Sequence, residues 1–578
     1  METIIGIDLG TTNSLCAVFK DGKPVLIPNS HGEFLTPSAV GILDEQVIVG
    51  AAAKELQVAQ PEKACLHFKR SMGTDTDFKI AGKVFNAPEL SAVILKHLKE
   101  DAEKFLAHEV RDAVVTVPAY FNDHQRKATK LAGKLAGLNI KRIINEPTAA
   151  ALVYGFHDQD ADKKLMIIDL GGGTFDVTIM EIFEGSLEIT STAGESFLGG
   201  EDFTLRMAAW TLQQAGMNFE MVEFRKPELM ARMLRLCEKA KREFADKEEV
   251  EIRIPDDKGD LTDQSIAMTK DQFQEITSEL MKRLEKPVIR SLRDADTLPD
   301  EIDEVILVGG ATRMSLVADF IQNLFKKDPC CEFDPDQVVA LGAAVQGALI
   351  KDDQAVDDMV MTDVCPFTLG TEVTKVFGHQ NQNGYFLPVI HRNTVIPVSK
   401  EEIVYTMHDN QRQLNIEVFQ GEGRKVKDNI QLGELKIDDL PAKPKGMPVH
   451  VRFSYDLNGI LEVEIYIPEN GKKYTTVLTN HAKSLDDSSV DDAVKKLQEL
   501  KFYPRDDIAN KRLLLFAESV VGELNVFERN GLEEVIDSFE SAMNSGDKDY
   551  YSATQKELLL KLSSLGHPYK NNAEGFGE

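Results

Sequence analysis

Ile4-Ile5-Gly6-Ile7-Asp8-Leu9-Gly10-Thr11-Thr12-Asn13 predicts a β-strand that ends in a tight turn. Aliphatic residues fill the first half, and Gly10 lets the backbone turn and approach a ligand closely. Short polar side chains follow it, and Asp8 stands at the strand end, where its carboxylate could face a metal held by a phosphate. Taken alone, Asp-x-Gly after a strand is most often only a turn.

The same pattern recurs in Lys164-Leu165-Met166-Ile167-Ile168-Asp169-Leu170-Gly171-Gly172-Gly173-Thr174-Phe175-Asp176. Two copies, one in each of two related lobes, predict two hairpins that grip a polyphosphate from opposite sides. Backbone N–H groups in glycine-rich turns bind anions. Asp8 and Asp169 would then hold Mg²⁺ through water, because Mg²⁺ loses its own waters reluctantly.

The bulk composition is that of an ordinary globular chain of several domains. The 578 residues are 42% hydrophobic and 28% charged, which is typical of globular proteins. A net charge of −29 disfavours nucleic acid and anionic membranes as partners. Without a basic segment and a long apolar run at the start of the sequence, we expect no signal peptide, and no apolar run is long enough to predict a membrane span. The six cysteines show no Cys-x-x-Cys spacing, so we interpret them as reduced thiols of a cytoplasmic protein.

Strands and helices alternate as far as residue 350, which predicts α/β layers. We expect strands and hairpins throughout residues 1–60 and buried strands at 113–118, 139–144 and 305–308. The residues with helical spacing fall in the ranges 90–107, 122–136, 200 onward, 227–246, 270–294, 313–326 and 335–350. A hairpin is expected at 250–268, around Asp256-Asp257-Lys258-Gly259.

The composition changes after residue 350. Residues 351–358 form an acidic connector. Beyond it, apolar residues alternate with polar ones, as where Leu461, Val463 and Ile465 face away from Glu462 and Glu464. With the turn signals between such runs, this pattern predicts an antiparallel β domain at about 364–480. Long charged segments with helical spacing follow from Asp486.

Several polar groups near these turns have both a structural and a functional interpretation. Lys69-Arg70 lies in a short polar loop, and such a pair is usually a solvated surface. Glu146 could be a first-turn acid favoured by the helix dipole, or a catalytic carboxylate. Asp176 could orient a water toward a γ-phosphate, since phosphoryl transfer needs positioned charge more than covalent help.

Two further groups have the chemistry of a nucleoside site. Glu238, Lys241 and Arg242 share one helix face, which is either a surface salt-bridge face or a clasp for ribose and purine. Gly309-Gly310-Ala311-Thr312-Arg313 follows a buried strand, and it is either a plain strand-to-helix turn or a wall of the nucleotide site.

The chain resembles the DnaK-type, seventy-kilodalton heat-shock chaperone family over nearly its whole length. The motifs that carry the resemblance are Gly6-Ile7-Asp8-Leu9-Gly10-Thr11-Thr12-Asn13-Ser14, Val117-Pro118-Ala119-Tyr120-Phe121-Asn122-Asp123, Ile144-Asn145-Glu146-Pro147-Thr148-Ala149-Ala150-Ala151, Asp169-Leu170-Gly171-Gly172-Gly173-Thr174-Phe175-Asp176, Leu198-Gly199-Gly200-Glu201-Asp202-Phe203 and Ile306-Leu307-Val308-Gly309-Gly310-Ala311-Thr312-Arg313. The resemblance implies an α/β, actin-like, two-lobed ATPase domain followed by an antiparallel β-sandwich and a short helical lid. The domain boundaries we expect are 1–351 for the nucleotide-binding domain, 352–363 for the linker, 364–482 for the peptide-binding domain, 483–566 for the lid and 567–578 for a disordered tail.

Position by position, the resemblance also implies roles for single residues. Catalysis would fall to Lys69, Glu146, Thr174 and Asp176, and the Mg²⁺-side carboxylates would be Asp8 and Asp169. The nucleotide-binding residues would be Gly10, Thr11, Thr12, Asn13, Gly172, Gly173, Thr174, Glu238, Lys241, Arg242, Gly309, Gly310, Arg313 and Asp336. The relay to the second domain would use Pro118, Arg126 and Asp363. The peptide pocket would be lined by Tyr405, Leu414, Ile416 and Ile460, with an extended peptide pairing its backbone.

Departures from the family pattern make the chain similar to the specialised HscC-type branch. The segment after Gly73 is short, and Ala245 replaces a hydroxyl near the nucleoside. The linker reads Met359-Val360-Met361-Thr362, and polar Thr362 predicts weaker docking. Thr371 and Thr374 replace larger apolar residues at the peptide groove, and the stretch from Val376 to Gly384 is longer than the family pattern. The helical tail is short, so peptide should leave faster.

The resulting hypothesis is an ATP-dependent chaperone whose ATPase cycle switches the affinity of the β domain for extended apolar segments of client proteins. By reciprocity, peptide should speed hydrolysis. ATP or ADP with Mg²⁺ is expected, K⁺ is a further candidate, a J-domain co-chaperone is an expected partner, and the chain is expected to be mostly monomeric. The need for a nucleotide exchange factor is left open. The alternatives are a nucleotide-gated regulator that sequesters one client, a sugar kinase on the same scaffold and a filament-forming actin relative.

Overall fold

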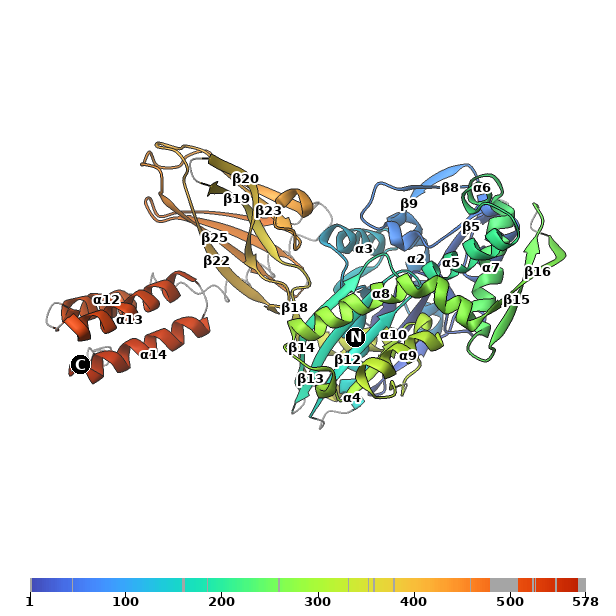
Figure 1. Cartoon of the computed structure of the whole chain (residues 1–578), viewed down its shortest axis with the longest axis horizontal. Helices are drawn as coiled ribbons and strands as arrows, with labels where there is room; N and C mark the ends of the chain where they lie inside the picture. The colour runs from blue at the N-terminus through green and yellow to red at the C-terminus, as the bar shows by residue number, and fades with distance from the viewer. Residues whose placement is uncertain are drawn as a thin grey trace. The chain divides into compact units, whose positions relative to one another are not determined.

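The chain divides into two compact units, Met1–Pro366 and Phe367–Glu578, which Figure 1 draws from blue to red along the sequence. The computed structural model describes residues 3–43, 45–157, 162–183, 186–257, 260–330, 332–351, 353–356, 359–377, 380–457, 459–478, 508–521, 524, 526–545 and 548–569. The first part of the expected lid, 483–507, and nearly all of the expected disordered tail lie outside these residues. So do Lys258 and Gly259 of the expected hairpin.

The first unit contains two mixed sheets with the same arrangement of strands. The first has the order β11-β10-β1-β2-β3, with β4 beside β2. Its strands are β1 (Ile4–Asp8), β2 (Asn13–Lys20), β3 (Lys23–Ile27), β4 (Thr36–Pro37), β10 (Asp112–Val117) and β11 (Asn139–Asn145). β1 pairs antiparallel with β2 and parallel with β10.

The second sheet repeats this plan in the order β17-β12-β13-β14-β18. Its strands are β12 (Lys163–Leu170), β13 (Phe175–Phe183), β14 (Ser186–Glu195), β17 (Glu304–Val308) and β18 (Val360–Val364). β12 pairs antiparallel with β13 and parallel with β17, as β1 does with β2 and β10. The predicted duplication of the strand and Gly/Thr turn is therefore present, and both turns lie at corresponding ends of the central strands.

Two almost fully buried helices, α4 (Glu146–His157) and α10 (Val338–Ile350), join the two sheets. They share a core with Ile4 and Val114 of the first sheet and Ile167 of the second. The two helices approach so closely that a Cβ added at Gly342 would lie 1.7 Å from the carbonyl oxygen of Ala149. Only glycine fits at this crossing, which fixes how the two sheets face each other.

The remaining helices of the first unit cover the outer faces of the sheets. They are α1 (Ala51–Ala59), α2 (Ala87–Leu106), α3 (Asp123–Leu135), α5 (Gly200–Gln214), α6 (Phe219–Arg225), α7 (Pro227–Glu243), α8 (Lys270–Asp294) and α9 (Ser315–Phe325). In Figure 1, α8 crosses β13 and β14, which it contacts. α1 corrects the expectation of strands throughout 1–60: Ala53 and Leu56 are buried three positions apart on one helical face.

Small sheets complete the first unit. Their strands are β5 (Ala39–Leu43), β6 (Gln46–Val49), β7 (Ala64–Leu66), β8 (Asp77–Ile80), β9 (Lys83–Asn86), β15 (Glu249–Pro255) and β16 (Leu261–Thr269). The last two confirm the hairpin expected at 250–268.

The end of the predicted linker is a strand of the first unit. In β18, Val360, Met361 and Thr362 pair parallel with Ser186, Leu187 and Glu188 of β14. The buried hydroxyl of Thr362 has no hydrogen-bond partner among the described residues, which is unfavourable for docking. Weaker docking of this segment stays a prediction, as do the domain boundaries.

The second unit contains two four-stranded antiparallel sheets, β20-β19-β23-β24 and β22-β25-β26-β27. Their strands are β19 (Leu369–Phe377), β20 (Gln380–Ile390), β22 (Val398–Tyr405), β23 (Leu414–Gln420), β24 (Ile430–Ile437), β25 (Pro448–Tyr455), β26 (Leu461–Ile467) and β27 (Lys472–Leu478). Three helices with their own core follow: α12 (Ile508–Val521), α13 (Val526–Ser545) and α14 (Lys548–Ser564). None of the described helices is long and apolar enough to cross a bilayer.

In the β22-β25-β26-β27 sheet of the second unit, the face that carries polar side chains is buried. Glu462 and Glu464 of β26 are covered as fully as the apolar residues between them. On the neighbouring strands, Glu401 accepts hydrogen bonds from Arg452 at 2.7 Å and lies 2.8 Å from the Nδ1 of His450. Buried charges of this kind are tolerated when they are paired, which the alternation of side chains alone did not indicate.

Candidate active site

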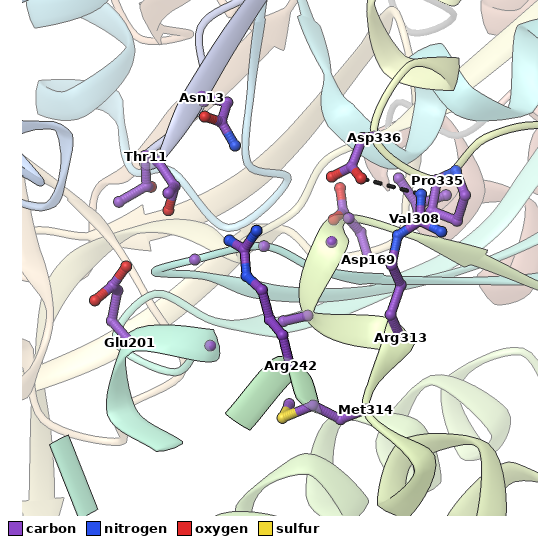
Figure 2. A pocket seen from close by; sticks show the side chains of 18 of the residues that line it. Thr11, Asn13, Asp169, Glu201, Arg242, Val308, Arg313, Met314, Pro335 and Asp336 are labelled. Carbon is purple, nitrogen blue, oxygen red and sulfur yellow. Dashed lines mark hydrogen bonds and ion pairs between the residues drawn. The ribbon is translucent and has the colours of Figure 1, made fainter. Parts of the chain in front are cut away.

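A cavity of about 340 Å³ opens between the two sheets of the first unit, within the usual size range of small-molecule sites. Both Gly/Thr turns line it, together with residues of α7 and of the turn before α9. Figure 2 shows Thr11 and Asn13 on one side, Arg313 with Asp336 on the other, and Arg242 reaching between them. The two halves of the duplicated fold therefore meet at one pocket.

The first turn is held in shape by backbone and hydroxyl contacts. Ser38 donates its hydroxyl to the carbonyl of Gly10 at 2.8 Å, and its N–H to the carbonyl of Thr12 at 2.9 Å. A Cβ on Gly10 would lie 2.0 Å from the carbonyl oxygen of Asn13, so the turn requires glycine. The buried hydroxyl of Thr12 has no hydrogen-bond partner among the described residues.

The second turn touches the first. A Cβ added at Gly172 would lie 1.9 Å from the Oγ1 of Thr12. The N–H groups of Gly200 and Glu201, at the start of α5, donate to the carbonyls of Gly171 and Gly172, both at 2.9 Å. The second turn and the first turn of α5 are thus one hydrogen-bonded unit facing Thr12.

Three aspartates stand at the strand ends beneath the two turns. Asp8 accepts a hydrogen bond from the hydroxyl of Thr116 at 3.0 Å, and Asp176 accepts one from the N–H of Tyr120 at 3.2 Å. Asp169 lies directly opposite Asp176 in the β12–β13 register. The predicted strand-end positions of Asp8 and Asp169 are confirmed, and Asp176 follows the second turn as the second residue of β13.

These aspartates are crowded by negative charge. Burial and then the nearby Glu146 raise the pKa of Asp8 to about 7 and that of Asp176 to about 8. The same two causes raise the pKa of Asp169 well above its ordinary value. Within the described ranges, no three His, Cys, Asp or Glu side chains are placed to hold a metal ion together.

Lys69 is buried and paired with Glu146, so of its two interpretations the structure excludes the solvated surface pair. Its Nζ lies 2.7 Å from the Oε1 of Glu146 and 5.5 Å from the centre of the Phe121 ring. It belongs to η2 (Phe68–Ser71), a short 3-10 turn in which Phe68 is buried as well. Phe68 packs into the core of the first lobe, and this packing draws the turn inward.

The far end of the pocket holds the predicted nucleoside residues. Glu238 of α7 lies 2.6 Å from Lys241 and 2.8 Å from Arg242. Across the pocket, Arg313 pairs with Asp336 at 3.1 Å and with Asp334 at 2.8 Å. Gly309, Gly310 and Ala245 also line the cavity. Both predicted groups therefore meet at one place, with acidic and basic groups available to a ribose and a base.

The expected relay residues form a connected chain of hydrogen bonds. Arg126 donates to the carbonyls of Ala119 and Phe121, next to Pro118, and to the side chain of Asn145 at 2.6 Å. Asn145 in turn donates to Asp363 at 3.3 Å. This path runs from the segment after β10, which holds Ala119 and Phe121, to the last residues of the first unit. Asn145 is the link between them, and although it stands in a quoted motif, no role was predicted for it.

The four residues expected to line a peptide pocket come from both sheets of the second unit. Leu414 and Ile416 lie on β23, Tyr405 ends β22, and Ile460 precedes β26. Ile416 and Ile460 are buried, whereas Tyr405 is 60% exposed. The peptide pocket stays a prediction.

Several residues of the site were missed at the sequence level. Arg70 reaches Asp202 at 2.6 Å and the carbonyl of Gly172 at 3.4 Å. Glu201 and Lys270 line the pocket. Glu201 and Asp202 stand inside the quoted Leu198–Phe203 motif, which was the available signal. Thr116 and Lys270 belong to no motif that was singled out.

Comparison with known proteins identifies the family. The Hsp70 protein family matches residues 4–565. The chain is similar to the chaperone protein DnaK of Thermotoga petrophila, with 38% identity over 99% of this chain and 98% of that protein. It is also similar to DnaK of Thermosipho africanus, with 37% identity over 99% and 98%, and of Thermotoga neapolitana, with 40% over 88% and 84%.

The chain belongs to the Hsp70 family. It is an ATP-dependent molecular chaperone, and its enzymatic activity is ATP hydrolysis. The family binds ATP and ADP with a divalent metal, and its chaperones bind client peptides and co-chaperones. The site fits this ligand, because the free hydroxyl of Thr12, the two glycine turns and the crowded aspartates offer donors to phosphate and charge to a cation.

Proposed function

We propose that ATP hydrolysis between the two turns of the first unit switches the affinity of the second unit for extended apolar peptide segments. In this proposal the first unit is an actin-like ATPase, the two sheets of the second unit form a β-sandwich, and its helices form a short lid. The observation that carries the proposal is the contact of the two turns at Gly172 and Thr12 above three strand-end aspartates.

The residues divide the work of phosphoryl transfer between them. Gly10 to Asn13 and Gly172 to Thr174 offer N–H and hydroxyl donors to the phosphates. Asp8 and Asp169 would hold the waters of Mg²⁺, which neutralises charge on the phosphates when bound. Lys69, held by Glu146, supplies a fixed positive charge, and Asp176, held by Tyr120, can orient the attacking water. Glu238, Lys241, Arg242, Arg313 and Asp336 would hold the nucleoside.

The direct test is steady-state ATP hydrolysis with and without a panel of extended apolar peptides and a J-domain protein. Stimulation by both is expected, because coupling between two sites is reciprocal. Stimulation by neither would contradict the chaperone cycle, and transfer of phosphate to a sugar would support the kinase alternative. Dependence of the hydrolysis rate on K⁺ and on an exchange factor can be measured in the same assay. We propose that the protein works as a monomer in the cytoplasm.

A second candidate is a nucleotide-gated regulator that sequesters one client, as a member of the HscC-type branch. One feature of the second unit favours it. Thr371, expected at the peptide groove, is fully buried and donates its hydroxyl to the carbonyl of Glu417 at 2.8 Å. A groove altered at this point would select fewer peptides. Binding of one client protein without affinity for the general peptide panel would support the second candidate.

A further inference from the structure

Four ionisable side chains join the two lobes of the first unit beside the phosphate turns. His67 Nε2 lies 3.0 Å from the Oε1 of Glu201, and Arg70 Nη2 lies 2.6 Å from the Oδ2 of Asp202. His67 and Arg70 flank Lys69 in the first lobe, whereas Glu201 and Asp202 form the first turn of α5 in the second. We name these four residues the clasp.

The clasp connects two parts of the site that must keep a fixed separation. On one side, His67 precedes η2, and its carbonyl accepts the N–H of Arg70 at 3.1 Å, so it starts the turn that carries Lys69. On the other side, the N–H of Glu201 donates to the carbonyl of Gly172. The His67–Glu201 pair therefore ties the turn of Lys69 to the second phosphate turn.

His67 also holds an unusual backbone conformation, with φ of 58° and ψ of 15°. Left-handed geometry is uncommon for residues other than glycine and persists only where surrounding contacts maintain it. The pair with Glu201 is such a contact, since it holds the side chain of the residue that bends the chain into η2. This is a second observation that His67 has a positioning role.

The clasp holds two full charge pairs only when its histidine is protonated. Burial alone would raise the pKa of Glu201, but His67, Lys241 and Arg70 outweigh burial and lower it to about 2. Glu201 is therefore ionised throughout the physiological range. Histidine is the side chain that ordinarily changes charge between pH 5 and 8. α2 also packs on η2. There the hydroxyl of Ser91 in α2 donates to the sulfur of Met72, the residue directly after η2, so this contact is uncharged.

We propose that His67 is a positioning residue whose ion pair with Glu201 holds the Lys69 turn against the second phosphate turn and slows nucleotide release at acidic pH. The proposal rests on ATP and ADP binding between the two turns. A polyphosphate held there leaves only when the turns separate, and separation breaks the clasp. Protonated His67 adds a charge pair to be broken, whereas neutral His67 leaves at most a hydrogen bond.

The test is the dissociation rate of a fluorescent ADP analogue from the full chain, followed by stopped flow between pH 5.8 and 8.2 at constant ionic strength. For the wild type we expect release about threefold slower at the acidic end than at the alkaline end, which is the effect of a partly exposed ion pair. His67→Gln should release quickly throughout, and His67→Lys should release slowly throughout, because its charge does not change in this range.

Two features of the design isolate His67. Asp8 and Asp176 also titrate within the pH range of this experiment, with pKa values of about 7 and 8. The informative quantity is therefore the ratio of the wild-type dissociation rate to that of His67→Gln at each pH. Arg235 and Glu55 form another pair between the lobes, at 2.6 and 2.8 Å. Arg235→Gln serves as the matched control: it removes an ion pair without a histidine, so the pH dependence should persist.

Each outcome decides the matter. A constant ratio of wild type to His67→Gln across the range would overturn the role of His67, while measurable ADP binding would leave the ATPase function standing. If Arg235→Gln also lost the pH dependence, the effect would belong to closure of the two lobes in general, and the proposed role of His67 would be overturned. Absence of nucleotide binding in the wild type would instead contradict the proposed function. If His67→Gln does not fold, the same comparison is made with Glu201→Gln, which should also remove the pH dependence.

Discussion

At the scale of single residues, the site depends on one buried cation among four carboxylates. Lys69 is 3% exposed and pairs with Glu146, within the influence of Asp8, Asp169 and Asp176. A fixed charge of this kind stabilises a phosphoryl-transfer transition state more than it stabilises bound ATP.

Lys69→Ala should therefore reduce the single-turnover rate of ATP hydrolysis by about a hundredfold or more. Nucleotide affinity, measured by fluorescence titration, should stay within a few-fold of the wild type, because the turns and the nucleoside residues are unchanged. Thr174→Ala should slow hydrolysis in the same way, and it should lose only the nucleotide affinity that the one hydroxyl removed from the second turn supplies. Lys79→Ala, an exposed lysine on β8, is the control, and normal hydrolysis by both site variants would refute the assignment.

The raised pKa values of Asp8 and Asp176 predict a pH-dependent stability of the nucleotide-free chain. The folded state keeps these protons up to about pH 7 and 8, whereas an unfolded aspartate loses its proton near pH 4. Stability from these groups is thus present at low pH and is lost as pH rises. Between pH 5.5 and 8 we expect the two groups together to lower the free energy of unfolding by about 5 kcal/mol.

Thermal unfolding measured across this pH range checks the expectation. Asp8→Asn cannot ionise, so its melting temperature should fall less as pH rises, and it should bind Mg²⁺ and ATP poorly. A melting temperature for the wild type that rises steadily toward pH 8 would contradict the proposed crowding of charge. Mg²⁺ with ADP should flatten the wild-type curve, because metal binding favours the ionised carboxylates.

At the scale of elements, the contact between the two glycine turns depends on a missing Cβ. Gly172→Ala would place a carbon 1.9 Å from the hydroxyl of Thr12, whereas Gly171→Ala meets only Thr174 atoms at 3.9 Å. The first variant should therefore separate the turns and lower the melting temperature of the nucleotide-free chain by several degrees.

Gly171→Ala is the neighbouring control and should melt close to the wild type. Nucleotide affinity should also fall by about tenfold or more in Gly172→Ala, because the donors of the two turns no longer converge. Equal melting temperatures for the two variants would mean that the turns do not touch in solution.

Patterns within one element were predictable from the sequence, and pairings between distant elements were not. The Asp-Leu-Gly repeat indicated both turns because each is decided by the ten residues around it. The burial of Lys69 depends on Phe68 packing into the first core and on Glu146, far along the chain. The Arg70–Asp202 and His67–Glu201 pairs likewise join segments whose spacing carries no periodicity. Glu462 and Glu464 look solvated by alternation, but their neighbours in three dimensions bury them.

At the scale of the whole molecule, coupling between the two units has a candidate path inside the first. Asn145 accepts a hydrogen bond from Arg126 at 2.6 Å and donates one to Asp363 at 3.3 Å. It is also the residue directly before Glu146. A change at Glu146, which we propose as a catalytic carboxylate, can thus be felt at the point where the chain leaves the first unit.

Asn145→Ala should keep basal ATP hydrolysis within about threefold of the wild type while losing most of the stimulation by peptide, since it removes one link of the path. Both rates come from one steady-state assay. Asn139→Ala, at the other end of β11 and bonded to Asp112, should keep the stimulation. Full stimulation of Asn145→Ala would show that the signal takes another route.

The position of β18 has a mechanical consequence. Its three paired residues run parallel to β14, and the chain leaves the first unit only a few residues later. Tension on the second unit would reach β18 through the chain that leaves its end, and would load the hydrogen bonds between β18 and β14. Release of the five residues of β18 would lengthen the connection by at most about 17 Å. The second sheet of the first unit would then lose a strand under load, so tension on a bound client would be felt at the nucleotide site.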